Sequence, residues 1–260
     1  MRTEQLRALL RDVVEAAISD MASVDDLRAS GERDGQYGLD LIVDGPLVER
    51  LLDAGLGVLS EEAGTLESDR SLLAVVDPID GSTNASRGLP WFNTSICVFD
   101  DEGPLVGYVE NHVTRDRFEA IRGEGAWRNG EVMTPPGGSV AGGVVAVNGV
   151  PPLGGPWAQF RALGASALDI SHVAAGVLDA YIDFDSEAHG LWDYAAAMLV
   201  CQEVGVAIVD AFDRPLAHRS HGDRRTPVVA HNVQDLEVLQ SLRRAAGPSP
   251  TSVGDGTDVS

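Results

Sequence analysis

Two carboxylates three positions apart, Asp77 and Asp80, could hold metal ions beside a phosphate group. They follow the apolar run 72–76, which predicts a buried strand. Pro78 has no amide donor and fixes φ at about −65°, so we expect the chain to leave the sheet there. Asp77, Asp80 and the carbonyl of Ile79 can then point into one small volume. Such oxygen ligands suit Mg²⁺, Mn²⁺ or Ca²⁺.

A turn of small residues, Gly81, Ser82 and Thr83, follows these carboxylates directly. The backbone amides of this turn are predicted to be free, and free amides at the start of a helix bind phosphate. A metal site and a phosphate site within one turn indicate phosphoryl chemistry.

Further acidic residues beside predicted strands and helices could complete the same site. They are Glu61 and Glu62 after the strand 58–60, Asp193 in the helix 192–203, and Asp44 at the start of the helix 44–55. A carboxylate at a helix start can also be an N-cap, so Asp193 and Asp44 could have that role instead. Six clustered carboxylates could not all stay ionised without cations among them. Two divalent ions about 4 Å apart would neutralise four of these charges.

Three of these motifs together resemble the inositol monophosphatase family: Glu61-Glu62, Asp77-Pro78-Ile79-Asp80-Gly81-Ser82-Thr83-Asn84 and Trp192-Asp193. This family belongs to the Mg²⁺-dependent, lithium-sensitive sugar-phosphate phosphatases. Three further segments are similar to family motifs in the expected order, namely 122–130, 163–169 and 177–181. The resemblance runs from about residue 40 to residue 245.

The resemblance implies two or three metal ions in one site, with Mn²⁺ as an alternative to Mg²⁺. The ligands that it implies are Glu61, Asp77 and the Ile79 carbonyl for the first ion, and Asp77, Asp80 and Asp193 for the second. Glu62 and Asp44 would either support a more weakly held third ion or lie just outside the ligands. Positive charge from these ions would lower the pKa of the attacking water and stabilise the leaving alkoxide.

The resemblance also implies catalytic and substrate-binding roles. Glu61 and the hydroxyl of Ser82 would orient and deprotonate the attacking water beside Asp77, in an in-line attack on phosphorus without a phosphoenzyme. The residues expected to contact substrate are Asp80, Gly81, Ser82, Thr83, Ser166, Asp183 and Asp193.

The chain departs from the family pattern at two places. Residues 38–44 lack the Lys and the Thr that family members commonly carry before Asp44. Between Tyr181 and Asp193 the chain is longer than the usual spacing. The sugar-binding acid could therefore be Asp183 or Asp185, and its distance from Tyr181 favours Asp183.

The resemblance implies a phosphomonoesterase that acts on a small polyol or sugar phosphate, with myo-inositol 1-phosphate as the first candidate. Fructose 1,6-bisphosphate is the main alternative, alone or as a second substrate. 3′-Phosphoadenosine 5′-phosphate and histidinol phosphate are further alternatives. A different class of function is a non-enzymatic role, since some bacterial relatives act through transcription complexes, but the complete set of acids argues against it.

Strands and helices mix along the whole chain, which predicts a layered α/β architecture. The Gly- and Pro-rich stretch 134–143 divides residues 1–135 from residues 136–246, and residues 247–260 have the composition of a disordered tail. The resemblance implies a five-layer αβαβα sandwich, a site between the two halves and a homodimer. Besides those named, the expected helices are 6–21, 166–177 and 233–245, and the expected strands are 92–99, 104–112, 116–121, 144–148, 179–184, 206–210 and 227–230.

Composition restricts the possible partners. The formal net charge is −21, with 40 acidic residues against 19 basic ones, all of them arginine. Such a polyanion repels nucleic acid and anionic membranes, so we expect neither as a partner. The acidity could reflect adaptation to high salt, or a genome that favours arginine over lysine.

The two cysteines, Cys97 and Cys201, lie in apolar runs, and no signal peptide is evident, so we expect a cytoplasmic protein.

Overall fold

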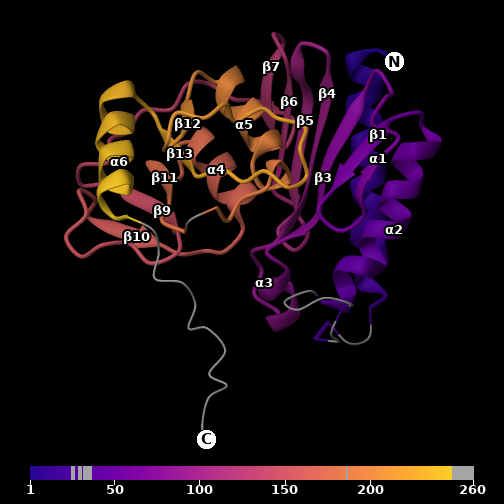
Figure 1. Ribbon diagram of the computed structural model, residues 1–260, viewed down its shortest axis with the longest axis horizontal. Coiled ribbons are helices and arrows are strands. Elements are labelled where there is room, and N and C mark those ends of the chain that lie inside the picture. Colours follow the sequence, from indigo (N-terminus) through magenta and orange to yellow (C-terminus); the bar gives the residue numbers. More distant parts are fainter. Residues whose placement is uncertain (25–26, 29–30, 32–36, 186, 248–260) are drawn as a thin grey trace, which may run out of the picture.

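The computed structural model arranges the chain in five alternating layers of helices and sheets (Figure 1). It describes residues 1–24, 27–28, 31, 37–185 and 187–247. All of the predicted tail except Gly247 lies outside the described residues. The layered α/β fold class predicted from the sequence is confirmed. The division of the chain at residue 135 stays a prediction.

The first sheet holds the strands from the N-terminal part of the chain. Its order is β2-β1-β3-β4-β5-β6-β7-β8, with β1 parallel to β3 and the other neighbours antiparallel. The bounds are β1 Gly57–Ser60, β2 Gly64–Leu66, β3 Leu73–Asp80, β4 Asn93–Asp100, β5 Gly103–Asn111, β6 Arg117–Ile121, β7 Gly125–Arg128 and β8 Glu131–Val132.

The second sheet is formed by the C-terminal part. Its order is β10-β9-β11-β13-β12, in which β9, β10 and β11 run parallel and β13 is antiparallel to both of its neighbours. The bounds are β9 Val144–Asn148, β10 Gln159–Arg161, β11 Ala180–Asp183, β12 Ala207–Asp210 and β13 Pro227–Ala230.

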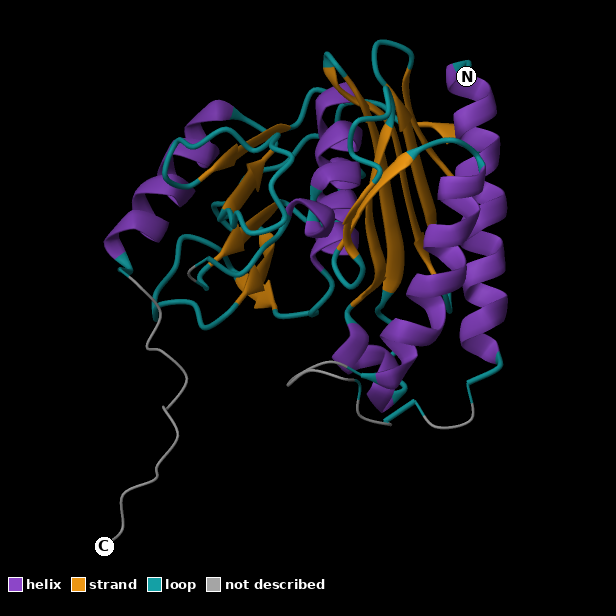
Figure 2. Cartoon of the chain, turned by 45° about the vertical axis from the view of Figure 1, so that its right-hand side comes forward, coloured by secondary structure: helices purple, strands orange, loops and turns teal. Residues whose placement is uncertain are grey.

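Helices cover both faces of each sheet (Figures 1 and 2). α1 and α2 cover the outer face of the first sheet, α4 and α5 lie between the two sheets, and α6 covers the outer face of the second. The bounds are α1 Thr3–Ala22, α2 Gly38–Asp53, α3 Ser82–Arg87, α4 Ser166–Ala174, α5 Ala195–Glu203 and α6 Val233–Ala245, with a 3₁₀ turn, η1, at Leu191–Asp193. None of the described helices combines the length and the apolarity that a membrane crossing requires.

Apolar periodicity explains why the outer helices pack on the first sheet. The side chains of α1 that are buried recur every three or four residues, which places them on one face. They are Leu6, Leu10, Val13, Val14, Ala17 and Met21, and they share a hydrophobic cluster with α2 and the first sheet. A second cluster fills the space between the sheets around α4 and α5. The helix predicted at 6–21 is therefore confirmed.

Helix α2 begins earlier than the predicted 44–55. It starts at Gly38, where the Asp40 carboxylate accepts a hydrogen bond of 3.0 Å from the Tyr37 N–H. Leu39 and Val43 are buried and extend the apolar face of the helix towards its N-terminus. Asp44 consequently lies inside the helix with its side chain buried, so the alternative that it caps the helix is wrong.

Strand β3 continues past Pro78, so the expectation that the chain leaves the sheet there is wrong. Asp77 pairs with Ser95 and Asp80 with Asn93, which leaves one extra residue on β3 between the two pairs. This is a β-bulge, and a bulge accommodates a proline because the ladder does not need its missing N–H.

We expect Gly107→Ala to destabilise the contact between β5 and α5. A Cβ added at Gly107 would lie 2.9 Å from the carbonyl oxygen of Ala196, so helix and strand would have to separate. The expected loss in the free energy of unfolding is about 1–3 kcal/mol, measured by urea denaturation. At Gly137 an added Cβ meets nothing within 4 Å, so Gly137→Ala is the control and should change stability by less than about 0.5 kcal/mol. Equal effects of the two variants would contradict this packing argument.

Candidate active site

Three carboxylates from distant parts of the chain converge at the end of β3. Asp77 and Asp80 belong to β3, and Asp193 lies in η1. Each offers an oxygen atom, and these atoms lie within 4.8 Å of one another. Among the described residues this is the group of His, Cys, Asp and Glu side chains close enough to share a metal ion. The structure thus brings together the acids of two separate sequence motifs.

The bulge in β3 aims the first two carboxylates. Asp77 accepts a hydrogen bond from the Ile79 N–H at 3.0 Å, which closes a tight turn around Pro78. The hydroxyl of Thr94 donates to the carbonyl of Pro78 at 2.7 Å and also lies 2.8 Å from Nε2 of His112. The Pro78 carbonyl is buried at an irregular place in the sheet, and Thr94 satisfies it.

Asp80, on the first sheet, also caps helix α4 in the layer between the two sheets. Its carboxylate accepts hydrogen bonds from the backbone N–H groups of Ser166 and Ala167 at 3.1 and 2.8 Å. The N-cap residue of α4, Ala165, has no side-chain oxygen, so Asp80 supplies the acceptor that a local cap would otherwise provide. Asn93 donates a further hydrogen bond of 2.7 Å to Asp80. Asp80 is therefore fixed by groups from both halves of the chain.

The turn after Asp80 presents free backbone amides next to the carboxylates. Gly81 has φ of +86°, and an added Cβ would lie 3.0 Å from the Gly164 carbonyl oxygen, so glycine suits this position. Ser82 begins α3, and its N–H and that of Thr83 have no acceptor within the helix. The Asn84 side chain donates to the carbonyl of Leu163 at 2.7 Å and so joins this turn to the segment preceding α4.

Glu61 follows β1 and faces the same carboxylates. Burial raises its pKa well above the usual range, and the charges of Asp193 and Glu62 raise it further. Nearby, the Ser60 hydroxyl donates to buried Asp44 at 2.5 Å. Glu61, in the turn after β1, thus lies near the acids of β3 and η1, and Asp44 of α2 contacts the last residue of β1.

Asp193 is not the N-cap of α5. It ends η1, and the N-cap position of α5 is Tyr194, which makes no capping hydrogen bond. The hydroxyl of Ser95 on β4 donates to the backbone carbonyl of Trp192 at 3.2 Å. The side chain of Asp193 is therefore available to the cluster, while its backbone is supported by the first sheet.

A buried polar network lies beyond Asp193. Nε2 of His189 lies 2.9 Å from the Tyr181 hydroxyl, 3.3 Å from the Ser166 hydroxyl and 3.6 Å from the Asp183 carboxylate, and Nδ1 lies 3.6 Å from Asp193. Burial alone would lower the pKa of His189, but the charges of Asp183 and Asp193 outweigh it and raise this pKa to about 9.

The two candidates for the sugar-binding acid differ in their surroundings. Asp183 is buried and accepts a hydrogen bond of 2.9 Å from Asn148, whereas Asp185 is exposed. One oxygen of Asp183 is buried without a hydrogen-bond partner. Asp183 is thus the acid that shares the network of His189.

Electrostatics at the centre favours bound cations. Burial raises the pKa of Asp77 well above its usual range, and the charges of Glu61 and Asp80 add to the effect. Burial and the charge of Asp193 raise the pKa of Asp80 to about 7. The donors are all oxygen atoms, which suits hard divalent cations such as Mg²⁺ or Mn²⁺. The residues present therefore fit a metal site.

The sequence did not predict some of the residues that support the site. The six histidines have no ligand spacing and indicated only structural or surface positions, yet His189 and His221 both contact the site. The position of His189, four residues before Asp193, was an available signal. Asn93 and Thr94 gave no signal, because their roles depend on the bulge in the neighbouring strand.

The fold and the site together are those of a class of enzymes that use metal ions to hydrolyse phosphate esters. The sequence profile of the inositol monophosphatase family matches residues 12–245, so the chain belongs to this family. Members of the family are metal-dependent phosphatases, and the chain is accordingly a phosphoric monoester hydrolase.

Individual relatives agree with this assignment. A fructose-1,6-bisphosphatase/inositol-1-monophosphatase of Thermococcus kodakarensis is 30% identical over 215 residues, which is 82% of this chain and 83% of the relative. An inositol-1-monophosphatase of Caulobacter vibrioides is 30% identical over 261 residues, 90% of this chain and 98% of the relative. A Pyrococcus horikoshii protein with similarities to inositol-1 monophosphatase superposes with a TM-score of 0.83 over 92% of this chain and 98% of its own, at 23% identity, which shows the shared fold.

We expect the metal-free protein to lose stability as the pH rises. Asp80 and Asp40 have pKa values of about 7 in the folded chain, against about 3.9 when unfolded. Between these values the folded state binds more protons, so the free energy of unfolding falls as the pH rises from about 4 to about 7. Thermal unfolding in EDTA should therefore give a lower Tm at about pH 8 than at about pH 5.5.

Added Mg²⁺ should raise the Tm more at the higher pH, because cations bind the ionised carboxylates. The variant Asp77→Asn carries one buried carboxyl fewer and should show a smaller dependence on both pH and Mg²⁺. A Tm in EDTA that increases towards alkaline pH would contradict the electrostatic argument.

Proposed function

We propose that this protein is a Mg²⁺-dependent phosphomonoesterase that hydrolyses a small polyol or sugar phosphate with an activated water. The observation that carries the proposal is the convergence of Asp77, Asp80 and Asp193 within 4.8 Å of one another, next to the free amides of α3. Oxygen ligands and phosphate-binding amides in one place are what phosphoryl transfer requires.

The proposed ligands come from the residues around the bulge. Glu61, Asp77 and the carbonyl of Ile79 would hold one ion and Asp77, Asp80 and Asp193 another, with Glu62 and Asp44 as further acids for a third. When bound, Mg²⁺ or Mn²⁺ supplies positive charge that stabilises the phosphoryl oxygens and lowers the pKa of a bound water. The strongly raised pKa values of Glu61 and Asp77 in the metal-free chain support these assignments.

The remaining roles belong to side chains and amides of the chain itself. Glu61 and the Ser82 hydroxyl would orient the attacking water and accept its proton. The backbone amides of Gly81, Ser82 and Thr83 would bind the phosphate oxygens. In this proposal these groups would position the water against the phosphorus for in-line attack, so the contribution of the protein would be chiefly positioning.

The sugar or polyol would lie between the phosphate turn and the network of His189. Ser166 and Asp183 are the proposed contacts to its hydroxyl groups, and the buried Asp183 oxygen that lacks a hydrogen-bond partner supports that choice over Asp185. Asp80 and Asp193 would border the same space. Inositol 1-phosphate and fructose 1,6-bisphosphate are the proposed substrates, since relatives named for each activity match this chain.

The homodimer and the cytoplasmic location stay predictions. The buried, unpaired state of Cys97 and Cys201 is compatible with a reducing compartment and supports the proposed location. Size-exclusion chromatography with light scattering would measure the oligomeric state directly.

A phosphate-release panel tests the substrate class. We expect Mg²⁺-dependent release from inositol 1-phosphate, fructose 1,6-bisphosphate or both, and much slower release from 3′-phosphoadenosine 5′-phosphate and histidinol phosphate. EDTA should abolish release, and Mn²⁺ should restore it. The same panel in a KCl series tests whether the net charge of −21 reflects adaptation to salt, which predicts activity that rises with KCl. Absence of metal-dependent release from all four esters would refute the proposed function.

We expect Asp193→Asn to lower kcat by at least about 100-fold, since even outer partners of metal ligands are worth 10- to 100-fold. The substitution keeps the shape of the side chain and removes one charge from the cluster. Asp101→Asn removes an exposed carboxylate at the distant turn between β4 and β5, and its kcat should equal that of the wild type. Steady-state hydrolysis at saturating Mg²⁺ measures both variants. An Asp193→Asn enzyme with wild-type activity would exclude Asp193 from the site.

A further inference from the structure

A single hydrogen bond joins the loop before β13 to the backbone of Glu61. Nε2 of His221 lies 3.2 Å from the carbonyl oxygen of Glu61, and the two residues are 160 positions apart. A carbonyl oxygen only accepts, so Nε2 of His221 carries the hydrogen. The N–H of Glu61 donates to the carbonyl of Val76 on β3 at 3.1 Å. Both backbone polar groups of Glu61 are therefore held, one by the sheet and one by His221.

The same imidazole packs against the segment that carries Asp193. The rings of His221 and Trp192 have their centroids 4.8 Å apart at an interplanar angle of 37°. Trp192 is buried and directly precedes Asp193. His221 thus touches both Glu61 and the neighbour of Asp193, which come from different halves of the chain.

Arg224 closes this set of contacts. Its guanidinium carbon lies 5.0 Å from the centroid of the Trp192 ring, and Nη1 donates to the carbonyls of His221 and Asp223 at 2.7 and 3.1 Å. The guanidinium therefore fixes the backbone of His221 and covers Trp192 at the same time. Cation–π contact and hydrogen bonding to the loop backbone act together here.

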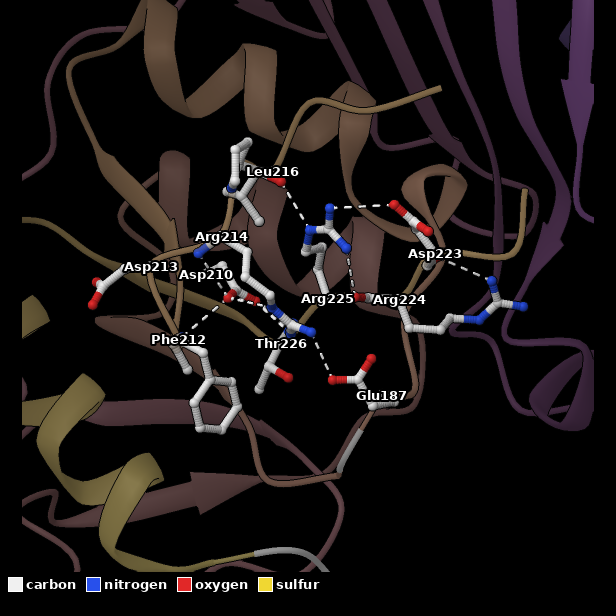
Figure 3. Close-up of polar contacts among 12 residues, drawn as sticks. Glu187, Asp210, Phe212, Asp213, Arg214, Leu216, Asp223, Arg224, Arg225 and Thr226 are labelled. Atoms are coloured by element: carbon white, nitrogen blue, oxygen red, sulfur yellow. Dashed lines mark hydrogen bonds and ion pairs between the residues drawn. The ribbon is translucent and has the colours of Figure 1, made fainter. Parts of the chain in front are cut away.

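The loop that carries His221 is braced at its base. The carboxylate of Asp210 accepts hydrogen bonds from the backbone N–H groups of Phe212, Arg214 and Thr226. Arg225 donates to the carbonyl of Pro215 at 2.8 Å and lies 3.5 Å from the Asp223 carboxylate. Figure 3 shows Arg214 pointing towards Asp210 and Glu187, and Arg225 towards Asp223. These contacts hold the loop in place and thereby fix the position of His221.

Glu61 needs such a support because its neighbours repel it. Its carboxyl group faces Asp193, Glu62 and Asp80, all of the same charge when ionised. It also lies in the turn after β1, beyond the last paired residue, Ser60. Before cations bind, this repulsion would displace a weakly held turn outwards. A displaced Glu61 would bind metal more weakly and would align the attacking water less well.

We propose that His221 is a positioning residue that fixes the backbone of Glu61 relative to Asp193, so that the carboxylates converge on the metal ions. This inference rests on the proposed function, because it assigns His221 to the same metal site. Partners of this kind, one contact away from metal ligands, are typically worth 10- to 100-fold in metal affinity or activity.

The test compares His221→Ala with His221→Gln and with a matched control. Glutamine can donate a hydrogen bond to the same carbonyl, whereas alanine cannot. The control is His231→Ala, because Nε2 of His231 also contacts a backbone carbonyl, that of Val173 at 2.8 Å, away from the carboxylate cluster. Isothermal titration calorimetry measures the binding of Mn²⁺ to the metal-free protein, and steady-state hydrolysis gives kcat and KM.

For His221→Ala we expect the Mn²⁺ dissociation constant to rise about 10-fold and kcat to fall about 10-fold, with KM changed by less than about 3-fold. His221→Gln should recover most of both losses. His231→Ala should lower the Tm while its Mn²⁺ affinity and kcat stay at the wild-type values. Wild-type Mn²⁺ affinity in His221→Ala, equal defects in His221→Ala and His221→Gln, or the same defects in His231→Ala would overturn the inference.

Calorimetry separates this inference from the proposed function. If the wild-type protein binds Mn²⁺ but hydrolyses no phosphate ester, the proposed function fails, while weaker binding in His221→Ala still supports the positioning role. If the wild-type protein hydrolyses phosphate esters and His221→Ala binds Mn²⁺ normally, the proposed function stands and the positioning role fails.

Discussion

The assembly of the site depends on the hydrogen bonds that the carboxylate of Asp80 accepts from helix α4. Asp80 ends β3 of the first sheet and accepts hydrogen bonds from the first backbone N–H groups of α4, the helix that lies between the two sheets. A helix with an uncapped N-terminus would leave buried donors unsatisfied, so a correctly aimed Asp80 stabilises α4 in its place. The same carboxylate belongs to the group of three acids that could hold a metal ion. Capping of α4 and the proposed metal binding therefore require the same position of this side chain.

The bulge at Pro78 makes that position possible. A regular strand would send alternate side chains to opposite faces, and Asp77 and Asp80 would point apart. The extra residue in β3 turns both carboxylates to the same side, and Thr94 compensates the irregular carbonyl of Pro78. Local irregularity of this kind is common next to active sites, because it re-aims side chains within an otherwise rigid sheet.

Negative charge is compensated in different ways at the site and in the rest of the molecule. The chain has 40 acidic residues and 19 arginines, and many arginines pair with acids away from the cluster, as Arg214 does with Asp210. Within the described residues, His189 is the basic side chain in contact with Asp193. At the centre of the site this imidazole compensates part of the negative charge, and the proposed metal ions would compensate the rest. Burial then strengthens each electrostatic interaction, which favours tight binding of divalent cations over diffuse screening.

The sequence by itself determined the chemistry of the turn 77–84, because consecutive residues fix their own spacing, and it predicted most strands and helices from their periodicity. It also indicated the family through motifs that are local. Only the tertiary structure decided that Asp44 lies within α2, that Asp80 caps α4 from 86 residues away, and that His221 contacts the backbone of Glu61. These outcomes depend on the packing of two sheets and the helices between them. Contacts between residues far apart in sequence arise from that packing, and no local pattern encodes them.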